Sequence, residues 1–371
     1  MKRLLVLLLA LFMLGSSAAC SRSPSGEADN SIAAPTTVGK TVGISFPNET
    51  DPCWKNDCAA LSEKLETLGC QVVPAYAADN PSLQAYQIAA MIAQPVDCLV
   101  VAAVDSLALT DVLRQAADAG IPVIAYDRLL MYTDAVSYYV GFDNEAVGIS
   151  IAEHIVAEKQ LESAKAESRS YTVEFFMGSP DDNNAVLLHW GIMQILQPYL
   201  DSGVLVCRTG RTAFEDVCIQ GWSEEIAAND CKKYLTRFYT DRAPDICCAA
   251  SDSIAQGCRT ALEGAGYGAG ERWPLITGQN ATLSAVKSIL SGHQSMTVYK
   301  DRAALIRDCE AAVTAVLTLT PAENANAVCH NGTMAVTAFL SAPIAVDKQN
   351  YREILVDSGV FSDEQLSIQA E

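Results

Sequence analysis

Five groups of polar residues stand where apolar runs of the sequence end. In chain order the groups are Asp127 with Arg128, residues 181–184, Ser251 with Asp252, residues 278–280, and Lys300 with Asp301. Their carboxylates, amides and single cations can accept and donate hydrogen bonds, as each hydroxyl group of a sugar requires. The pattern therefore predicts a site for a polyhydroxylated ligand. The alternative is that these are ordinary loop and helix-capping residues, which applies above all to Asp182 and Ser251.

The apolar runs are predicted to be strands, because segments with a helical period alternate with them. The expected strands cover residues 41–46, 71–75, 98–102, 122–126, 171–177, 204–208, 246–250, 275–277 and 297–299. Helices are expected over 54–68, 82–92, 107–117 and 184–200. This alternation indicates doubly wound parallel sheets, whose ligands bind beyond the carboxyl ends of the strands. A polar stretch at 159–170 interrupts the series, so two similar α/β lobes are expected.

The N-terminus predicts export. Lys2 and Arg3 precede an apolar run over 4–14, and small residues lead from there to Cys20. This order is typical of a secretory signal, and the run is shorter than the about 20 residues of a membrane-spanning helix. The small residues before Cys20 resemble a bacterial lipoprotein processing site. We therefore expect a signal peptide over 1–20, a lipid on Cys20 that anchors the protein outside the cytoplasm, and a flexible tether over 21–39; secretion without a lipid is the alternative.

Composition argues against some partners and cofactors. The net charge of −19 disfavours binding to nucleic acid, and 371 residues favour more than one domain. The thirteen cysteines include no CxxC pair and the four histidines are dispersed, so neither a metal site nor a cofactor is expected. Export permits disulfides, but the sequence does not assign the pairs, and a bond between Cys53 and Cys58 is one alternative.

Six segments stand out along the chain, and four of them contain polar groups named above: AYDRLL (125–130), FDNEAVG (142–148), FFMGSPDDNNA (175–185), GQNATLSAVKSIL (278–290), MTVYKD (296–301) and VDKQNYREILVDSG (346–359). Together they resemble the ribose- and xylose-type family of periplasmic sugar-binding proteins, nearest its xylose-binding and multiple-sugar-binding branch. The resemblance implies two lobes joined by a three-segment hinge, with the ligand cleft between them. The expected crossings lie near 142–144, 299–301 and 329–333. The lobes would comprise 40–143 with 300–331, and 144–299 with 332–371.

The resemblance also implies which residues contact the sugar. Trp54 would stack on the sugar ring, and the polar contacts would come from Asp127, Arg128, Asn184, Asp252, Asn280 and Lys300. Cys53, Asp182 and Gln279 would lie behind these residues or make further contacts. Two positions depart from the family pattern, since Cys53 replaces an Arg and Asn280 replaces an Asp. We therefore expect a sugar preference shifted from that of the family.

The expected function is binding without catalysis. The protein would capture a monosaccharide, xylose or a related aldose, by hinge closure and deliver it to the permease of an ABC transporter; a chemoreceptor or sensor kinase is a further candidate partner. The sugar, its anomer and the oligomeric state are left open, with a monomer assumed. One alternative is a nucleoside or signalling-molecule receptor of the same fold. The other is a glycoside hydrolase, in which Asp127 and Asp252 would face each other at about 5–10 Å.

Overall fold

The computed structural model describes residues 36–94, 96–268 and 273–367, which belong to one compact unit that begins at residue 35. The predicted signal peptide, Cys20 and the tether up to residue 35 lie outside the described residues. Within the described ranges, none of the helices combines the length and the apolar character needed to cross a membrane.

The first sheet has seven strands in the order β11-β12-β5-β4-β3-β1-β2. They are β1 (Thr41–Phe46), β2 (Gln71–Tyr76), β3 (Cys98–Val101), β4 (Val123–Tyr126), β5 (Val136–Phe142), β11 (Ala327–His330) and β12 (Ala335–Ser341). All neighbours are parallel except β11 and β12. The predicted parallel α/β fold is thus confirmed, although β5, β11 and β12 were not among the predicted strands.

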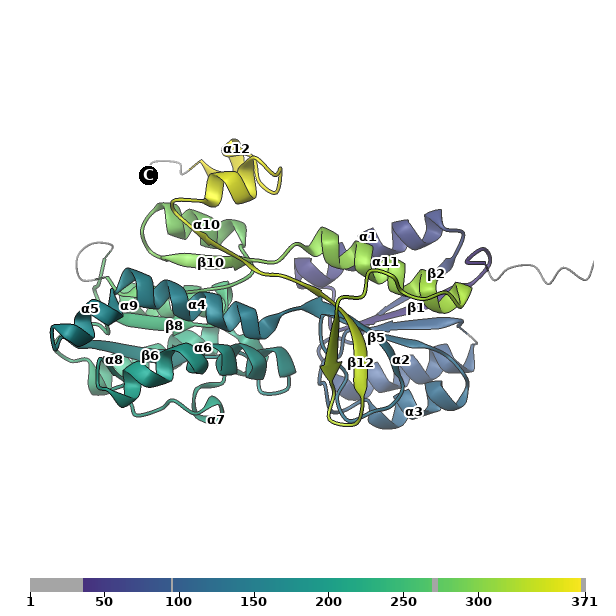
Figure 1. Cartoon of the computed structure of the whole chain (residues 1–371), viewed down its shortest axis with the longest axis horizontal. Helices are drawn as coiled ribbons and strands as arrows, with labels where there is room; N and C mark the ends of the chain where they lie inside the picture. Colours follow the sequence, from purple (N-terminus) through teal and green to yellow (C-terminus); the bar gives the residue numbers. More distant parts are fainter. Residues whose placement is uncertain (1–35, 95, 269–272, 368–371) are drawn as a thin grey trace, which may run out of the picture. The chain divides into compact units, whose positions relative to one another are not determined.

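Helices cover both faces of this sheet, as Figure 1 shows. They are α1 (Pro52–Thr67), α2 (Pro81–Ala93), α3 (Thr110–Asp118) and α11 (Arg302–Thr318). Alternate residues of β3 enter opposite cores: Cys98 and Val100 pack toward α1 and α11, whereas Leu99 and Val101 pack toward α2 and α3. A strand buried on both faces has to be apolar throughout, which is why the sequence shows a continuous run here.

The second group of strands forms a four-stranded parallel sheet in the order β7-β6-β8-β9 and a separate antiparallel pair, β10 with β13. The strands are β6 (Tyr171–Phe176), β7 (Leu205–Val206), β8 (Ile246–Ala249), β9 (Leu275–Ile276), β10 (Met296–Tyr299) and β13 (Ile344–Asp347). The helices are α4 (Asn144–Glu158), α5 (Leu161–Ala166), α6 (Asn183–Asp201), α7 (Phe214–Val217), α8 (Glu224–Phe238), α9 (Asp252–Gly264), α10 (Leu283–Leu290) and α12 (Asp363–Leu366). Helices α4 and α6 meet closely because Gly148 lies against the carbonyl of Leu188, where a Cβ atom would clash.

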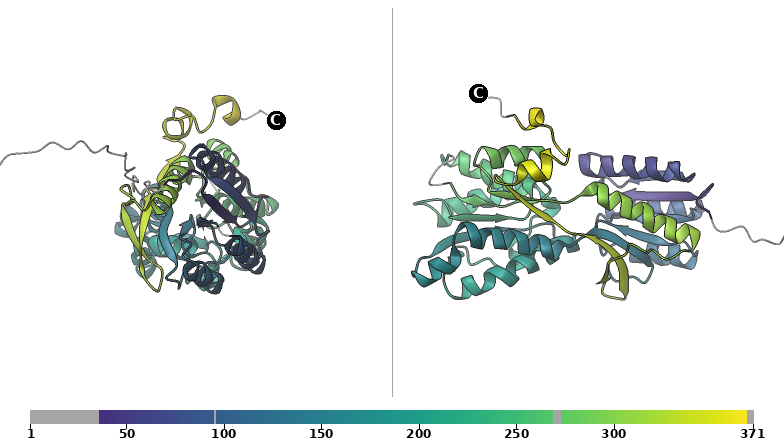
Figure 2. Two further views of the ribbon diagram at one scale, coloured as in Figure 1. Left: turned by 90° about the vertical axis from the view of Figure 1, so that its right-hand side faces the viewer. Right: turned by 45° about the horizontal axis from the view of Figure 1, so that its top comes forward.

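The predicted crossing at 329–333 is wrong. These residues form the turn between β11 and β12, and β12 pairs with β5 in the seven-stranded sheet. Figure 2 shows this yellow-green hairpin beside the blue strands of the same sheet. The chain leaves that sheet only after Ser341, because the next strand, β13, pairs with β10. We therefore propose one lobe of 36–142 with 302–341 and a second of 144–299 with 344–367.

Candidate functional site

Asp127 follows β4 directly, and its backbone is held from several sides. It has a left-handed conformation with φ of 59°, which Asp tolerates better than most residues. Its N–H donates to the carbonyl of Val140 at 2.7 Å. Its own carbonyl accepts hydrogen bonds from the Tyr139 hydroxyl at 2.9 Å and from the Asn184 side-chain amide at 3.0 Å. The Asp127 carboxylate is therefore placed by contacts from both β5 and α6.

A cation that the sequence did not single out binds this carboxylate. Nη1 of Arg302, the first residue of α11, donates to Oδ2 of Asp127 at 3.1 Å. The same guanidinium binds Asp57 of α1 through Nε, at 3.0 and 2.9 Å from its two oxygens. Burial alone would raise the pKa of Asp127, but the charges of Arg302, Lys300 and Arg128 hold this pKa below its ordinary value. Asp127 is thus an ionised acceptor.

Trp54, the predicted stacking residue, lies in α1 and is only 7% exposed. Its ring meets Phe46 edge-on with 5.6 Å between centroids. The guanidinium carbons of Arg128 and Arg302 lie 5.5 and 5.6 Å from the ring centroid. The structure therefore brings Trp54 together with Arg128 and, through Arg302, with Asp127.

Arg128 links the turn after β4 to the turn after β6. Its Nη1 donates to the carbonyls of Ala103 and Val104 at 2.9 and 3.1 Å, and its Nε lies 3.2 Å from Oδ2 of Asp182. Asp182 also caps α6 by accepting the N–H of Asn184 at 3.0 Å. Asp182 is therefore both the N-cap of α6 and the ion-pair partner of Arg128. Ser251 is likewise the N-cap of α9.

Both carboxylate oxygens of Asp252 accept hydrogen bonds from other residues of the protein. Its Oδ1 accepts from Gln294 Nε2 at 3.0 Å and from the Thr297 hydroxyl at 2.8 Å. Its Oδ2 accepts from the N–H and the hydroxyl of Thr282, at 2.8 and 3.1 Å. Four donors use the about four acceptor positions of a carboxylate. In this structure Asp252 therefore positions the start of α10 and strand β10, and burial raises its pKa to about 6.

Three buried polar atoms beside these residues have no hydrogen-bond partner in the described part of the chain: Oδ1 of Asn184, Oε1 of Gln279 and Oγ of Ser106. Buried polar groups are normally paired, so these atoms are available to bind a polar ligand or water. The Ser106 N–H donates to the carbonyl of Asp181 at 3.1 Å, which places Ser106 beside the turn after β6. Ser106 was not predicted, although it follows β3 as the five predicted groups follow their strands.

The side chains of Lys300 and Asn280 have no hydrogen-bond partner among the described residues. The Lys300 ammonium lies 5.1 Å from the centroid of Phe142. Burial lowers the pKa of Lys300, and the nearby charge of Asp127 opposes this effect. Asn280 is exposed, has a φ of 100° and is fixed through its N–H, which donates to Val298 at 2.8 Å.

The cysteines beside the site are thiols. Cys53 and Cys58 are both free, so the alternative of a bond between them is not present in the structure. Burial raises the pKa of the Cys53 thiol to about 12, although the charge of Arg302 opposes this. Among the described residues, no three side chains of the metal-binding types are grouped so as to hold an ion.

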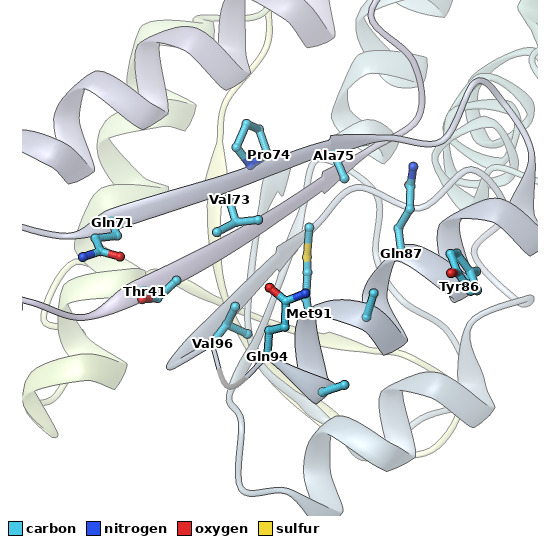
Figure 3. A pocket seen from close by; sticks show the side chains of 12 residues that line it. Thr41, Gln71, Val73, Pro74, Ala75, Tyr86, Gln87, Met91, Gln94 and Val96 are labelled. Atoms are coloured by element: carbon cyan, nitrogen blue, oxygen red, sulfur yellow. The ribbon is translucent and has the colours of Figure 1, made fainter.

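A groove of about 720 Å³ lies elsewhere on the first sheet, between edge strand β2 and α2 (Figure 3). Its lining includes Val73, Pro74, Tyr86 and Met91, and none of the predicted site residues. Pro74 lacks an N–H and so discourages a further strand from pairing with this edge. The groove is mostly apolar and lacks the carboxylates and cations that surround Asp127.

The chain matches a known protein family. Residues 42–319 match the family described as "Periplasmic binding protein domain". The chain is 38% identical to a multiple sugar-binding periplasmic protein of Azospirillum brasilense, over 88% of this chain and 90% of that one. It is 34% identical to a D-xylose-binding periplasmic protein of Haemophilus influenzae, over 88% and 91%.

A solved structure has the same fold. The ABC transporter solute-binding protein of Clostridium phytofermentans with bound β-D-glucose superposes with a TM-score of 0.82, at 37% identity over 88% of this chain and all of that chain. The chain therefore belongs to the periplasmic binding protein family and is similar to members of it that are named for binding multiple sugars and D-xylose.

Proposed function

We propose that the protein is an extracytoplasmic solute-binding protein that captures a neutral aldose and delivers it to an ABC transporter permease. One observation carries this proposal above others. The turns after β3, β4 and β6 meet around Asp127 and Arg128, and they leave buried acceptors on Asn184 and Ser106 without partners. A ligand rich in hydroxyl groups supplies the donors that these atoms lack.

The charges favour a neutral ligand. Arg128 is paired with Asp182, and Arg302 with both Asp57 and Asp127, so that together with Lys300 three cations balance three carboxylates. A site without excess charge gives no advantage to a sugar acid or a phosphate. The relatives named for xylose and for multiple sugars, and the neighbour that holds glucose, support an aldopyranose such as D-xylose or D-glucose.

We propose the contacts of the site as Trp54, Asp127, Arg128, Asn184, Asn280 and Lys300, supplemented by Gln279 and Ser106. Asp252 acts in this proposal by holding the turn before α10. Binding would close the two lobes about the three crossings, a common movement in periplasmic binding proteins. The hydrolase alternative is disfavoured because both oxygens of Asp252 already accept hydrogen bonds from protein donors.

Isothermal titration calorimetry with D-xylose, D-glucose, D-glucuronate and adenosine tests the proposal. We expect saturable binding of one or both aldoses and much weaker binding of the other two ligands. Tight binding of adenosine alone would favour the nucleoside receptor instead. Incubation with nitrophenyl glycosides tests catalysis, and release of nitrophenol above the buffer rate would contradict a purely binding role.

A further inference from the structure

Arg302 stands where the chain returns from β10 to the first sheet. It is the first residue of α11, and its guanidinium joins two carboxylates from different elements. Nε and Nη2 bind Asp57 of α1, and Nη1 binds Oδ2 of Asp127 at 3.1 Å. Asp57 is in turn fixed by the Tyr126 hydroxyl, which donates to it at 2.7 Å. The guanidinium is therefore held in one orientation.

This orientation leaves part of the guanidinium free. An arginine side chain has five N–H donors. Asp57 uses one on Nε and one on Nη2, and Asp127 uses one on Nη1. Within the described ranges the other two N–H groups have no recorded acceptor, and the Arg302 side chain keeps 25% of its surface exposed. Arg302 is thus anchored on one side and can still donate on the other.

The free donors lie beside a free acceptor. Arg302 binds Oδ2 of Asp127, and for Oδ1 no donor is recorded among the described residues. A sugar hydroxyl can donate to a carboxylate oxygen while it accepts from a neighbouring N–H. The Trp54 ring lies at the same place, with its centroid 5.6 Å from the guanidinium carbon.

We infer that Arg302 is a ligand-binding residue, which donates to the same sugar hydroxyl that donates to Asp127, and that Asp57 and Tyr126 fix it in position for this contact. The inference rests on the proposed function, since it assigns a further residue to the sugar site. The opposing view is that Arg302 only ties α11 to α1 through the ion pair with Asp57.

A pair of variants separates the two views. Asp57→Asn keeps an acceptor for Tyr126 and Arg302 but removes the buried charge, so that Arg302→Gln can be added without leaving Asp57 unpaired. By calorimetry with D-glucose and D-xylose, the double variant should bind about 10-fold to 100-fold more weakly than Asp57→Asn alone, as expected for a lost charge-assisted hydrogen bond. Equal affinities of these two proteins would overturn the inference.

Arg307→Gln is the matched control. Arg307 lies on the same helix, is 58% exposed and is 3.6 Å from Asp301, so its removal should leave sugar affinity unchanged. Thermal denaturation shows whether each variant is folded. If the double variant does not fold, Arg302→Lys provides the measurement. It keeps the charge but not the paired donors, and we expect a loss of about tenfold; wild-type affinity would refute the contact.

Deoxy sugars identify the contact itself. The monodeoxy analogues of D-glucose should each bind Asp57→Asn more weakly than glucose does. Adding Arg302→Gln to Asp57→Asn should weaken the binding of glucose by a certain factor. For one deoxy analogue this factor should be smaller by about fivefold or more, because that analogue lacks the hydroxyl group that Arg302 would bind. A uniform loss for all analogues would mean that Arg302 acts only on the structure. If the wild type binds no aldose, the proposed function fails as well, which is a different result from sugar binding that is insensitive to Arg302.

Discussion

The guanidinium of Arg128 lies 3.2 Å from the carboxylate of Asp182, and this ion pair joins the turn after β4 to the turn after β6. The two side chains are only 15% and 5% exposed. A pair so little exposed is screened weakly by salt, and loss of one partner leaves the other charge buried and unpaired.

Asp182→Ala should therefore destabilise the protein by more than the loss of a helix cap. We expect the free energy of unfolding to fall by about 3 kcal/mol, measured by urea denaturation. Ser223→Ala, which removes the cap of α8 without an ion pair, is the control and should cost about 1 kcal/mol. Equal losses in the two variants would show that the pair with Arg128 contributes nothing.

Asp127→Ala should weaken aldose binding by about 2–4 kcal/mol, because donors of the ligand and of the site are then left without an acceptor. From the sequence alone we expect little change in stability. The contact with Arg302 alters that expectation, and the variant should also be less stable. Asp111→Ala, which removes an exposed carboxylate on α3, should affect neither quantity. Wild-type affinity of the Asp127 variant in calorimetry would place the site elsewhere.

Asp252 should make stability depend on pH in the acid range. Burial raises its pKa to about 6 in the folded protein, above the about 3.9 of an unfolded chain. The folded state then holds the proton more tightly, so this contribution is complete below pH of about 4 and is lost as the pH rises through about 6. The unfolding free energy of the wild type minus that of Asp252→Asn should therefore decrease by up to about 3 kcal/mol as the pH rises over that range. A difference that does not change with pH would contradict the raised pKa.

Cys20→Ala should release the protein from membranes. If Cys20 carries a lipid, the wild-type protein sediments with the membrane fraction and its mature N-terminus begins at this residue. The variant should remain unprocessed or appear in the soluble fraction, as immunoblots of fractionated cells would show. A mature wild-type N-terminus at another residue would disprove the anchor and leave the sugar-binding proposal intact.

The sequence alone determined the architecture and most of the strand ends that we propose as the ligand site. Strands β1, β3, β6 and β8 could be recognised in the sequence as continuous apolar runs, because strands covered on both faces must be apolar along their whole length. Residues 127, 128, 182 and 184 could be chosen because they follow the carboxyl ends of parallel strands, where ligands of such sheets bind, and because the family resemblance implied roles for them there. The turn at 329–333 was misassigned because a strand's pairing partner is distant in the chain, and only register with β5 shows where β12 belongs.

Only the tertiary structure decided what each of these side chains does. Asp127 and Asp252 both lie just beyond the end of a strand. Four donors nevertheless bind the Asp252 carboxylate, whereas one oxygen of Asp127 has no donor among the described residues. Arg302 lies 175 positions from Asp127 in the chain, and no spacing rule connects them. Local sequence sets the strand and helix periods, whereas the pairing of charges depends on which helices the sheet brings together.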